Sequence, residues 1–374
     1  MKDSLKITRR EFIKRSSALT VCSSLVPCIN LDALGESSSL KEARYYEKLS
    51  DNRIQCNLCP WNCIVEAGKR GHCQVRENRK GTYYSLVYGK ISVYHNDPIE
   101  KKPFFHVLPS TYAFSIASVG CNVDCKFCQN WELARRSLKE VYTVNFTPEE
   151  IIRYARKANS ASIAFTYNEP TIFNEFVYDV ADMAHKNRLR TVVVSNGYIN
   201  KKPLLDLCSK IDAYKVDLKA FTKDYYRDVV HGRLEPVKDT LITLRQEGIW
   251  SEIVYLMVPT LNDNMDDIKR MCKWVKSELG DDIPVHFSRF YPKYKLRNLP
   301  PTPVKTMVEA RKTALDAGLK FVYLGNIPGH EGENTYCPSC NKTLIRRVGY
   351  RVYENHIENG TCEYCGGKIP GIWN

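Results

Sequence analysis

Three tight groups of cysteines constrain this chain more than any other feature. Of its 15 cysteines, eleven fall into groups of four, three and four, and only Cys208 and Cys272 stand alone after residue 50. Disulfide frameworks suit short secreted domains, whereas a chain of 374 residues can bury a large core. Cysteines two or three residues apart instead suit ligands that converge on one metal centre. We therefore expect a metalloprotein in which Cys208 and Cys272 are buried apolar residues.

The charge balance is basic but evenly spread. Lys and Arg number 55 against 42 Asp and Glu, which gives a net charge of +13. No run of five or more basic residues occurs. A solvated basic surface is therefore the favoured interpretation, and an acidic substrate, an acidic partner or nucleic acid is the alternative.

The N-terminus resembles an export signal. Thr-Arg-Arg-Glu-Phe-Ile-Lys at residues 8–14 is typical of a twin-arginine leader, and a mildly apolar stretch follows at 18–34. We expect a signal peptide over 1–35, a polar linker over 36–50 and export to the periplasm or cell envelope. The alternative is a basic tail on a cytoplasmic protein. No segment reaches the ~20 uninterrupted apolar residues of a membrane span, so no transmembrane helix is expected.

From residue 111 the chain alternates strand and helix patterns. Short runs rich in Val, Ile, Tyr and Phe predict strands at 111–118, 161–166, 191–195, 213–218, 252–258, 284–290 and 320–324. Capping signals predict helices that begin near Thr147 and near Thr302. This alternation predicts an α/β fold, a partial (β/α)6-type TIM barrel over 111–330, whose site residues lie at the C-terminal ends of the strands. A Cys-rich module at 51–110 and a small module at 331–374 are expected to flank it.

The central cysteine group follows the first barrel strand directly. Cys121, Cys125 and Cys128 have CxxxCxxC spacing. Three thiolates can hold three irons of a [4Fe-4S] cube and leave the fourth iron without a protein ligand. An open position is what a catalytic metal needs. The alternative is a three-cysteine zinc site or a structural cluster.

This motif resembles that of the radical S-adenosylmethionine (SAM) superfamily. Over nearly the whole chain after the leader, the sequence is similar to the radical SAM enzymes of the AmmeMemoRadiSam system, relatives of the pyruvate formate-lyase activating enzyme. The matching segments are 56–60, 70–73, 97–103, 127–131, 168–171, 195–198, 216–219, 259–263, 286–290 and 325–326. The resemblance implies that the cluster binds SAM and cleaves it reductively. The resulting 5′-deoxyadenosyl radical would abstract hydrogen from an unidentified substrate. The twin-arginine leader is an addition to the family pattern.

The resemblance also implies a SAM pocket at the strand ends. Its expected members are Phe127, Asn168, Glu169, Ser195, Asn196, Asp217, Lys219 and His286. Glu169 would accept the SAM amino group, although Tyr-Asn stands where the family has two glycines. The alternatives are a carboxylate that favours a helix start for Glu169, a buried ion pair for Asp217 and Lys219, and a core position for His286.

The two outer cysteine groups predict further metal sites. Cys56, Cys59, Cys63 and Cys73 suit either tetrahedral zinc or a second iron–sulfur cluster that passes electrons to or from the first. The spacing of Cys337, Cys340, Cys362 and Cys365 resembles a zinc ribbon. We expect zinc there, with iron as the lesser alternative and a structural or partner-binding role.

The expected function is therefore that of a radical SAM enzyme with an unidentified substrate. The alternatives are a glycyl-radical enzyme activase, an RNA-modifying radical enzyme and a non-catalytic metal-binding module. The expected partner is a flavodoxin- or ferredoxin-like electron donor, and a protein substrate is a further candidate. The resemblance adds a pathway association with Memo-type and AMMECR-type proteins.

Overall fold

Seven parallel strands and one antiparallel strand form the central sheet of the described part of the chain. The computed structural model describes residues 40–374, so the expected signal peptide and residues 36–39 lie outside it. The strand order is β16-β15-β14-β13-β12-β11-β9-β8, and only the β8–β9 pair is antiparallel. The strands are β8 (Val93–Pro98), β9 (Tyr112–Ala117), β11 (Ser162–Phe165), β12 (Arg190–Ser195), β13 (Ala213–Asp217), β14 (Trp250–Met257), β15 (Val285–Arg289) and β16 (Val322–Gly325).

The predicted α/β class and partial barrel are confirmed. Each of the seven predicted runs contains or overlaps one of the parallel strands, and β8 and β16 are left as the two edges of an open sheet. The sheet begins before residue 111, because β8 lies within the segment expected to be the Cys-rich module. Central strands such as β11 and β12 are buried almost throughout, as parallel strands covered on both faces must be.

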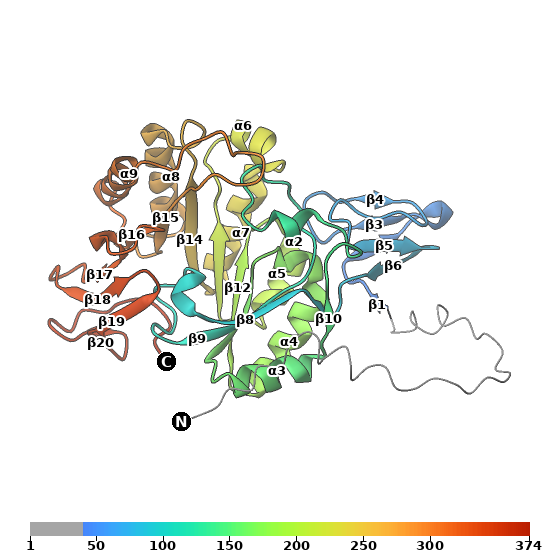
Figure 1. The fold of residues 1–374 in the computed structure, drawn as a ribbon, viewed down its shortest axis with the longest axis horizontal. Coiled ribbons are helices and arrows are strands. Elements are labelled where there is room, and N and C mark those ends of the chain that lie inside the picture. Colours follow the sequence, from blue (N-terminus) through green and yellow to red (C-terminus); the bar gives the residue numbers. More distant parts are fainter. Residues whose placement is uncertain (1–39) are drawn as a thin grey trace, which may run out of the picture. The chain divides into compact units, whose positions relative to one another are not determined.

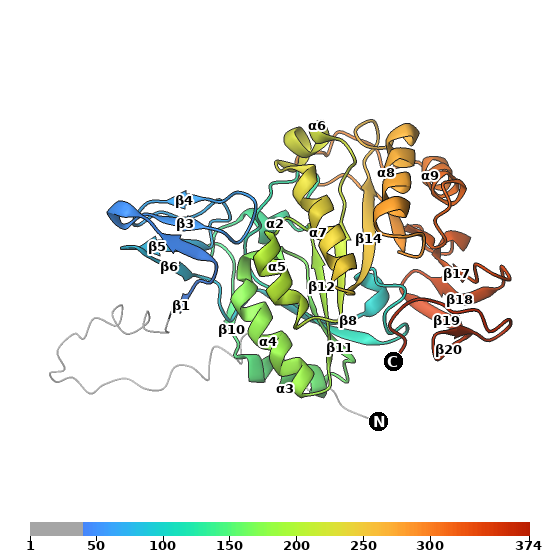
Figure 2. The same ribbon diagram turned by 180° about the vertical axis from the view of Figure 1, so that it is seen from behind.

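Helices cover the outer face of this sheet, as Figures 1 and 2 show. They are α3 (Pro148–Lys157), α4 (Asn174–Lys186), α5 (Lys201–Cys208), α7 (Leu234–Gln246), α8 (Met265–Glu278) and α9 (Val304–Asp316). The capping box expected at the start of α3 is present, since the Thr147 side chain accepts from the Glu150 backbone N–H and Glu150 reaches back to Thr147. Two shorter helices, α2 (Trp131–Arg135) and α6 (Lys223–Tyr225), lie near the mouth of the barrel.

The N-terminal cysteines lie in a module of short strands on one flank of the sheet (Figure 1). Its strands are β1 (Lys41–Glu42), β2 (Tyr46–Lys48), β3 (Ile54–Cys56), β4 (Ile64–Val65), β5 (Arg76–Arg79) and β6 (Thr82–Ser85). Residues 40–50, expected to be linker, supply β1 and β2 to it. A buried ion pair between Arg76 and Glu175 joins the module to α4. A separate two-stranded ladder pairs β7 (Lys90–Ile91) with β10 (Val144–Asn145).

The C-terminal module lies on the opposite flank, against the edge strand β16 (Figure 1). Its strands are β17 (Thr335–Tyr336), β18 (Thr343–Val348), β19 (Arg351–Asn355), β20 (Ile357–Glu358) and β21 (Thr361–Cys362). Its core is shared with the barrel, because Leu344 and Cys337 pack in one apolar cluster with Phe321, Tyr323 and Phe105. Among residues 40–374, no helix is both long enough and apolar enough to cross a bilayer.

Candidate functional site

A cavity of about 420 Å³ opens at the C-terminal ends of the parallel strands. Its lining includes all eleven residues expected to bind the barrel cluster and SAM: Cys121, Cys125, Phe127, Cys128, Asn168, Glu169, Ser195, Asn196, Asp217, Lys219 and His286. These residues come from five different strands or the loops that follow them, so only the parallel topology brings them together. The predicted site is therefore one place in the fold.

The loop after β9 presents the three central cysteines to the cavity. Cys125 is buried, while Cys121 and Cys128 are partly exposed. Burial raises the pKa of all three thiols, that of Cys125 to about 12. Such thiols ionise only beside strong positive charge, as iron would supply. The site therefore suits metal ligation better than a free nucleophile.

The sulfur atoms of the four C-terminal cysteines lie close together. Within residues 40–374, one set of potential ligands has atoms that all lie within 4.8 Å of one another, namely Cys337, Cys340, Cys362 and Cys365. There the Sγ atoms of Cys337 and Cys365 are 3.6 Å apart, and those of Cys340 and Cys362 are 3.8 Å apart. Four thiolates about 2.3 Å from one zinc ion at tetrahedral angles have sulfur separations of about 3.8 Å.

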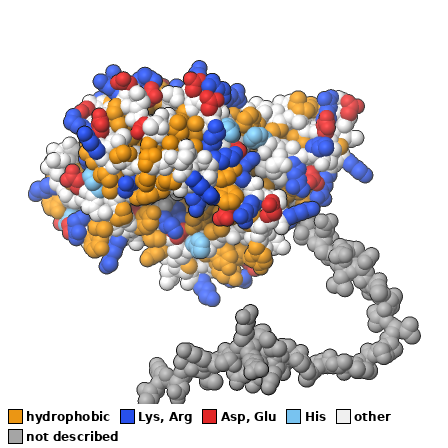
Figure 3. Space-filling model, turned by 45° about the horizontal axis from the view of Figure 1, so that its top comes forward, with side chains coloured by type: hydrophobic (Ala, Val, Ile, Leu, Met, Phe, Trp, Pro, Cys, Tyr) orange, Lys and Arg blue, Asp and Glu red, His pale blue; other side chains and the backbone are white. Residues whose placement is uncertain are grey.

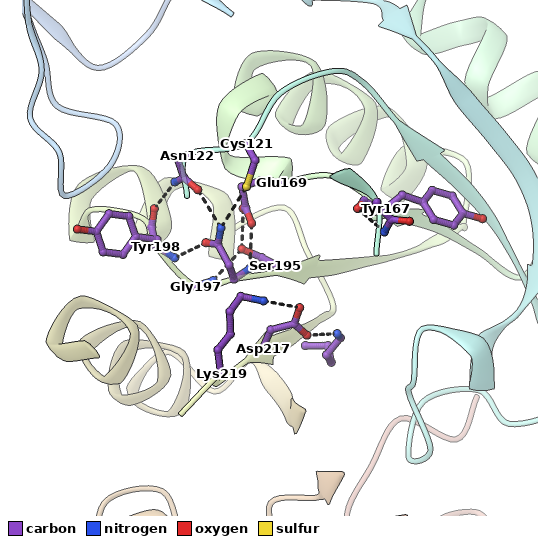
Figure 4. Close-up of polar contacts among 12 residues, drawn as sticks. Cys121, Asn122, Tyr167, Glu169, Ser195, Gly197, Tyr198, Asp217 and Lys219 are labelled. Atoms are coloured by element: carbon purple, nitrogen blue, oxygen red, sulfur yellow. Dashed lines mark hydrogen bonds and ion pairs between the residues drawn. The ribbon is translucent and has the colours of Figure 1, made fainter. Parts of the chain in front are cut away.

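Glu169 is the centre of a hydrogen-bond network beneath the cluster loop (Figure 4). Its Oε1 atom accepts from Ser195 Oγ at 2.7 Å and from Thr171, and its Oε2 atom accepts from the Asn196 backbone N–H at 2.8 Å. Burial raises the pKa of Glu169, while these donors oppose the shift. The carboxylate thus orders the turn after β12 as well as facing the cavity.

Asn196 connects this network to the cluster loop. Its Nδ2 atom donates to Asn122 Oδ1 at 2.9 Å and lies 3.7 Å from Cys121 Sγ. Asn168 also serves the loop, because its side chain accepts from the Ser118 N–H and donates to the Gly120 carbonyl at 3.1 Å. Both amides therefore position the metal-binding loop from below.

Two lysines flank Asp217 at the end of β13. Lys219 Nζ lies 3.2 Å from Asp217 Oδ2, and Lys215 pairs with the other carboxylate oxygen. Burial alone would raise the pKa of Asp217, but the two lysines outweigh it and lower that pKa to about 2. Lys219 also lies 5.7 Å from the centre of the Phe127 ring. The ion pair that was the alternative to SAM binding is present, and Lys215 gives the group a net positive charge.

A second lysine pair around Asp97 was not anticipated from the sequence. Lys101 Nζ and Lys102 Nζ lie 2.8 and 2.5 Å from the two carboxylate oxygens, and the Tyr167 hydroxyl also donates to Asp97. Burial lowers the pKa of Lys102 to about 8. The segment 97–103 was quoted only for its family resemblance, and a buried lysine beside a proline-rich loop gives no local signal of a cavity.

Tyr167 occupies the turn where the family has a glycine. Its φ of 67° lies in the left-handed region, which glycine enters without cost. The hydroxyl bond to Asp97 and the 4.5 Å contact of Lys102 with the ring help to hold this conformation. The substitution therefore couples the Glu169 turn to the Asp97 group.

His286 faces the cavity but is also part of the buried core. Its Nε2 atom lies 2.6 Å from Glu252 Oε2, and burial lowers the pKa of the imidazole. Glu252 also accepts from the backbone N–H groups of Phe105 and His106. This carboxylate was missed because a single acid in an apolar strand resembles a surface position.

The C-terminal module contributes to the cavity wall. Glu333, Gly349 and Tyr350 line the cavity together with the barrel residues. The sequence indicated a separate metal module and gave no sign of this contact. The module therefore shapes the site as well as carrying four cysteines that could hold a metal ion.

Comparisons with known proteins agree with this geometry. Residues 115–275 match the radical SAM superfamily. An uncharacterized protein of Methanocaldococcus jannaschii is 45% identical over 332 residues, which cover 88% of this chain and 99% of that protein. The pyruvate formate-lyase-activating enzyme of Clostridium pasteurianum is 22% identical over 222 residues, which cover 54% of this chain and 87% of the enzyme.

Solved structures align less closely. Streptococcus suis SuiB bound to S-adenosylmethionine aligns with a TM-score of 0.45 and 12% identity, over 61% of this chain and 53% of SuiB. The superfamily match covers the strands and loops that carry the central cysteines, Glu169 and Asp217. The match over residues 115–275 shows that this chain carries a radical SAM domain and belongs to the radical SAM superfamily.

Proposed function

We propose that Cys121, Cys125 and Cys128 hold three irons of a [4Fe-4S] cluster and that SAM binds beside it in the cavity. The observation that carries the proposal is the meeting of these three thiols with the polar strand ends in one cavity. When bound, the cluster and SAM supply reductive cleavage of the sulfonium bond and a 5′-deoxyadenosyl radical. The substrate is a molecule that gives up a hydrogen atom within this cavity.

The chain's own residues orient the bound groups. Lys219, held by Asp217, places a positive charge at the cavity wall where it can pair with the SAM carboxylate. Glu169 offers a carboxylate to the SAM ammonium, and the Asn196 amide fixes the loop beside Cys121. Phe127 and Val254 add apolar surface that excludes water. His286, held by Glu252, also lines the cavity and would contact the adenine or the substrate.

Zinc is proposed for the C-terminal module. The sulfur separations of 3.6 and 3.8 Å match the edges of a tetrahedral zinc site. Gly366 has a φ of 70°, which allows the chain to turn back after Cys365. The zinc would stabilise a module that is also part of the cavity wall.

The pathway and compartment are proposed from sequence resemblance. The segments quoted above favour membership of the AmmeMemoRadiSam system, with Memo-type and AMMECR-type proteins as pathway partners and a flavodoxin- or ferredoxin-like donor. The twin-arginine pattern, which lies outside the described residues, favours export to the periplasm or cell envelope over a cytoplasmic location. Fusing residues 1–40 to a reporter tests this, since export that survives Arg9→Lys plus Arg10→Lys contradicts it.

Glycyl-radical activation is the second candidate. It is favoured by the similarity to the Clostridium pasteurianum activating enzyme. An RNA substrate has less support, because on the face in Figure 3 Lys and Arg alternate with Asp and Glu and form no single patch. Steep loss of RNA binding with added salt would be the sign that RNA is bound.

The experiment that tests the proposal is a turnover assay on anaerobically reconstituted protein. We expect SAM and a strong reductant to yield 5′-deoxyadenosine, and we expect Cys125→Ala to abolish it. Cys208→Ala, which removes a buried thiol of α5 far from the cluster loop in sequence, should leave the yield unchanged. An intact cluster that produces no 5′-deoxyadenosine would refute the proposal.

A further inference from the structure

We infer that Cys56, Cys59, Cys63 and Cys73 bind a second [4Fe-4S] cluster, and that this cluster delivers single electrons to the one on Cys121, Cys125 and Cys128. The relay, although not the second cluster itself, rests on the proposed function. Two features support the inference: the convergence of the four cysteines, and the contacts that join their loops to the residues on either side of Cys121.

Backbone hydrogen bonds gather the four cysteines into one small region. The N–H of Cys56 donates to the carbonyl of Cys63 at 2.8 Å, where β3 pairs with β4. The turn after Cys59 closes through the Asn62 N–H, which donates to the Cys59 carbonyl at 3.0 Å and returns the chain to Cys63. The His72 N–H points at Cys63 Sγ from 3.5 Å, which brings the adjacent Cys73 to the same place.

Two direct contacts connect the N-terminal cysteines to the barrel cluster loop. Trp61 Nε1 donates to the Asn122 carbonyl at 2.6 Å, and Trp61 lies two residues after Cys59. The Cys73 carbonyl lies so close to Gly120 that a Cβ added there would meet it at 3.1 Å. Gly120 and Asn122 are the two neighbours of Cys121. The backbone of Cys73 therefore lies against Gly120, the residue before Cys121.

Other contacts fix this approach. Arg233 Nη2 donates to the Pro60 carbonyl at 2.7 Å, and Asn200 Nδ2 donates to the Asn57 carbonyl at 2.8 Å. Trp61 stacks on His72 with ring centres 4.2 Å apart and meets Tyr198 edge-on at 5.9 Å. The module is thus attached to the loops after β12 and before α7, beside the cavity. A rigid short path of this kind suits electron transfer between two centres.

The electron balance of the relay is simple. A low-potential one-electron donor of the flavodoxin or ferredoxin class reduces the outer cluster from the 2+ to the 1+ state and is itself oxidised by one electron. The outer cluster then returns to 2+ as the barrel cluster accepts that electron. No bond forms or breaks within the relay, and no proton is required.

The first test removes the barrel site and leaves the N-terminal module untouched. The triple variant Cys121→Ala, Cys125→Ala, Cys128→Ala, reconstituted anaerobically as the full chain, should retain about four irons per chain, against about eight in the unaltered protein. Its reduced state should give a paramagnetic signal that SAM does not change. Zinc in place of this iron, or no metal at the N-terminal group, would overturn the inference.

Matched variants separate this inference from the proposed function. Cys208→Ala with Cys272→Ala, which removes the two isolated thiols, should keep all the iron. If the triple variant holds four irons while the unaltered protein makes no 5′-deoxyadenosine, the proposed function fails and the second cluster stands.

The second test concerns the relay. Replacing Cys56, Cys59, Cys63 and Cys73 with Ala should leave the barrel cluster and its SAM-sensitive signal after chemical reduction. Its reduction by a photoreduced flavodoxin should slow at least tenfold. Trp61→Leu, which removes the bond to Asn122 and the ring contacts with His72 and Tyr198, should keep both clusters and slow the same step to a smaller extent. An unchanged rate in both variants would overturn the relay.

Discussion

Arg347 Nη2 donates a 2.8 Å hydrogen bond to the carbonyl oxygen of Phe105, and this bond joins the C-terminal module to the wall of the cavity. The guanidinium is 1% exposed and lies 4.2 Å from the centre of the Phe105 ring. It also donates to Thr335 Oγ1 at 2.8 Å and to the Glu333 carbonyl at 3.3 Å. One side chain therefore orders the module, the loop after β8 and the site between them.

Arg347→Met should destabilise the protein. The substitution leaves the buried acceptors of Phe105 and Thr335 without their donor, which should lower the free energy of unfolding by about 2–3 kcal/mol. Denaturant unfolding followed by fluorescence measures this change. Arg351→Met, at an exposed position of the same module, should shift the free energy by less than about 0.5 kcal/mol. Equal effects of the two substitutions would contradict the assigned role of Arg347.

Cys340→Ser should release the C-terminal zinc without disturbing iron. Structural zinc supplies folding energy to the small modules that bind it, so the chain beyond residue 330 should become sensitive to protease. Metal analysis should show one zinc fewer per chain and unchanged iron, and mass spectrometry should locate the cleavage sites. Ser339→Ala, in the same loop, is the control and should keep zinc and protease resistance. Zinc that persists in Cys340→Ser would exclude this assignment.

Lys102 should make stability depend on pH in the alkaline range. Burial lowers its pKa from 10.5 to about 8, against the opposing effect of Asp97. Between pH 8 and pH 10.5 this lysine keeps its proton in the unfolded chain and loses it in the folded chain. The free energy of unfolding therefore rises with pH over this range, by at most about 3 kcal/mol.

The measurement is the difference in unfolding free energy between the unaltered protein and Lys102→Met across that range. The charged groups facing Lys102 are Asp97, Lys101 and Lys215, and the Tyr167 hydroxyl donates to Asp97. The difference should change in favour of the unaltered protein as pH rises from 8 to 10.5. The matched substitution Lys101→Met, at a more exposed ammonium on the same carboxylate, should show a smaller change. A flat difference for Lys102→Met would show that its pKa is not lowered.

Asp217→Asn should weaken SAM binding. The substitution removes the carboxylate that holds Lys215 and Lys219 at the cavity wall, and loss of one well-placed ion pair of about 1.4 kcal/mol corresponds to tenfold in affinity. Calorimetric titration of SAM into anaerobic protein with verified iron content measures this. Asp224→Asn, at an exposed carboxylate of α6, should bind SAM normally. Normal affinity in Asp217→Asn would remove this group from the SAM site.

The central sheet and the central site could both be predicted from the sequence. Val-, Ile- and aromatic-rich runs separated by capped helices leave a parallel sheet as the simplest fold, and such a sheet gathers the residues after each strand at one edge. Cys121, Glu169 and Asp217 each follow or end a strand, so their meeting follows from topology alone. Local residue patterns, together with the rule that the residues after parallel strands meet at one edge of the sheet, were enough to predict this site.

The remaining site residues depend on packing that local patterns do not encode. Lys215 and Glu252 lie in apolar strands where a single charged residue resembles an exposed edge position, yet both are buried by neighbouring strands and loops. Tyr350 reaches the cavity only because the C-terminal module folds back on β16. The choice between zinc and iron likewise depends on sulfur spacing, which identical Cys-x-x-Cys patterns do not reveal.

The position of the C-terminal module has a consequence for how the protein behaves in concentrated solution. β16 is the last strand of the sheet, and a bare edge strand invites pairing with the strand of another molecule. The module covers the apolar surface beside it, where Phe321 and Tyr323 are 2% and 1% exposed. A chain shortened to residue 330 would uncover that surface together with a free strand edge. Its defect would appear as self-association and precipitation at protein concentrations where the full chain stays dispersed.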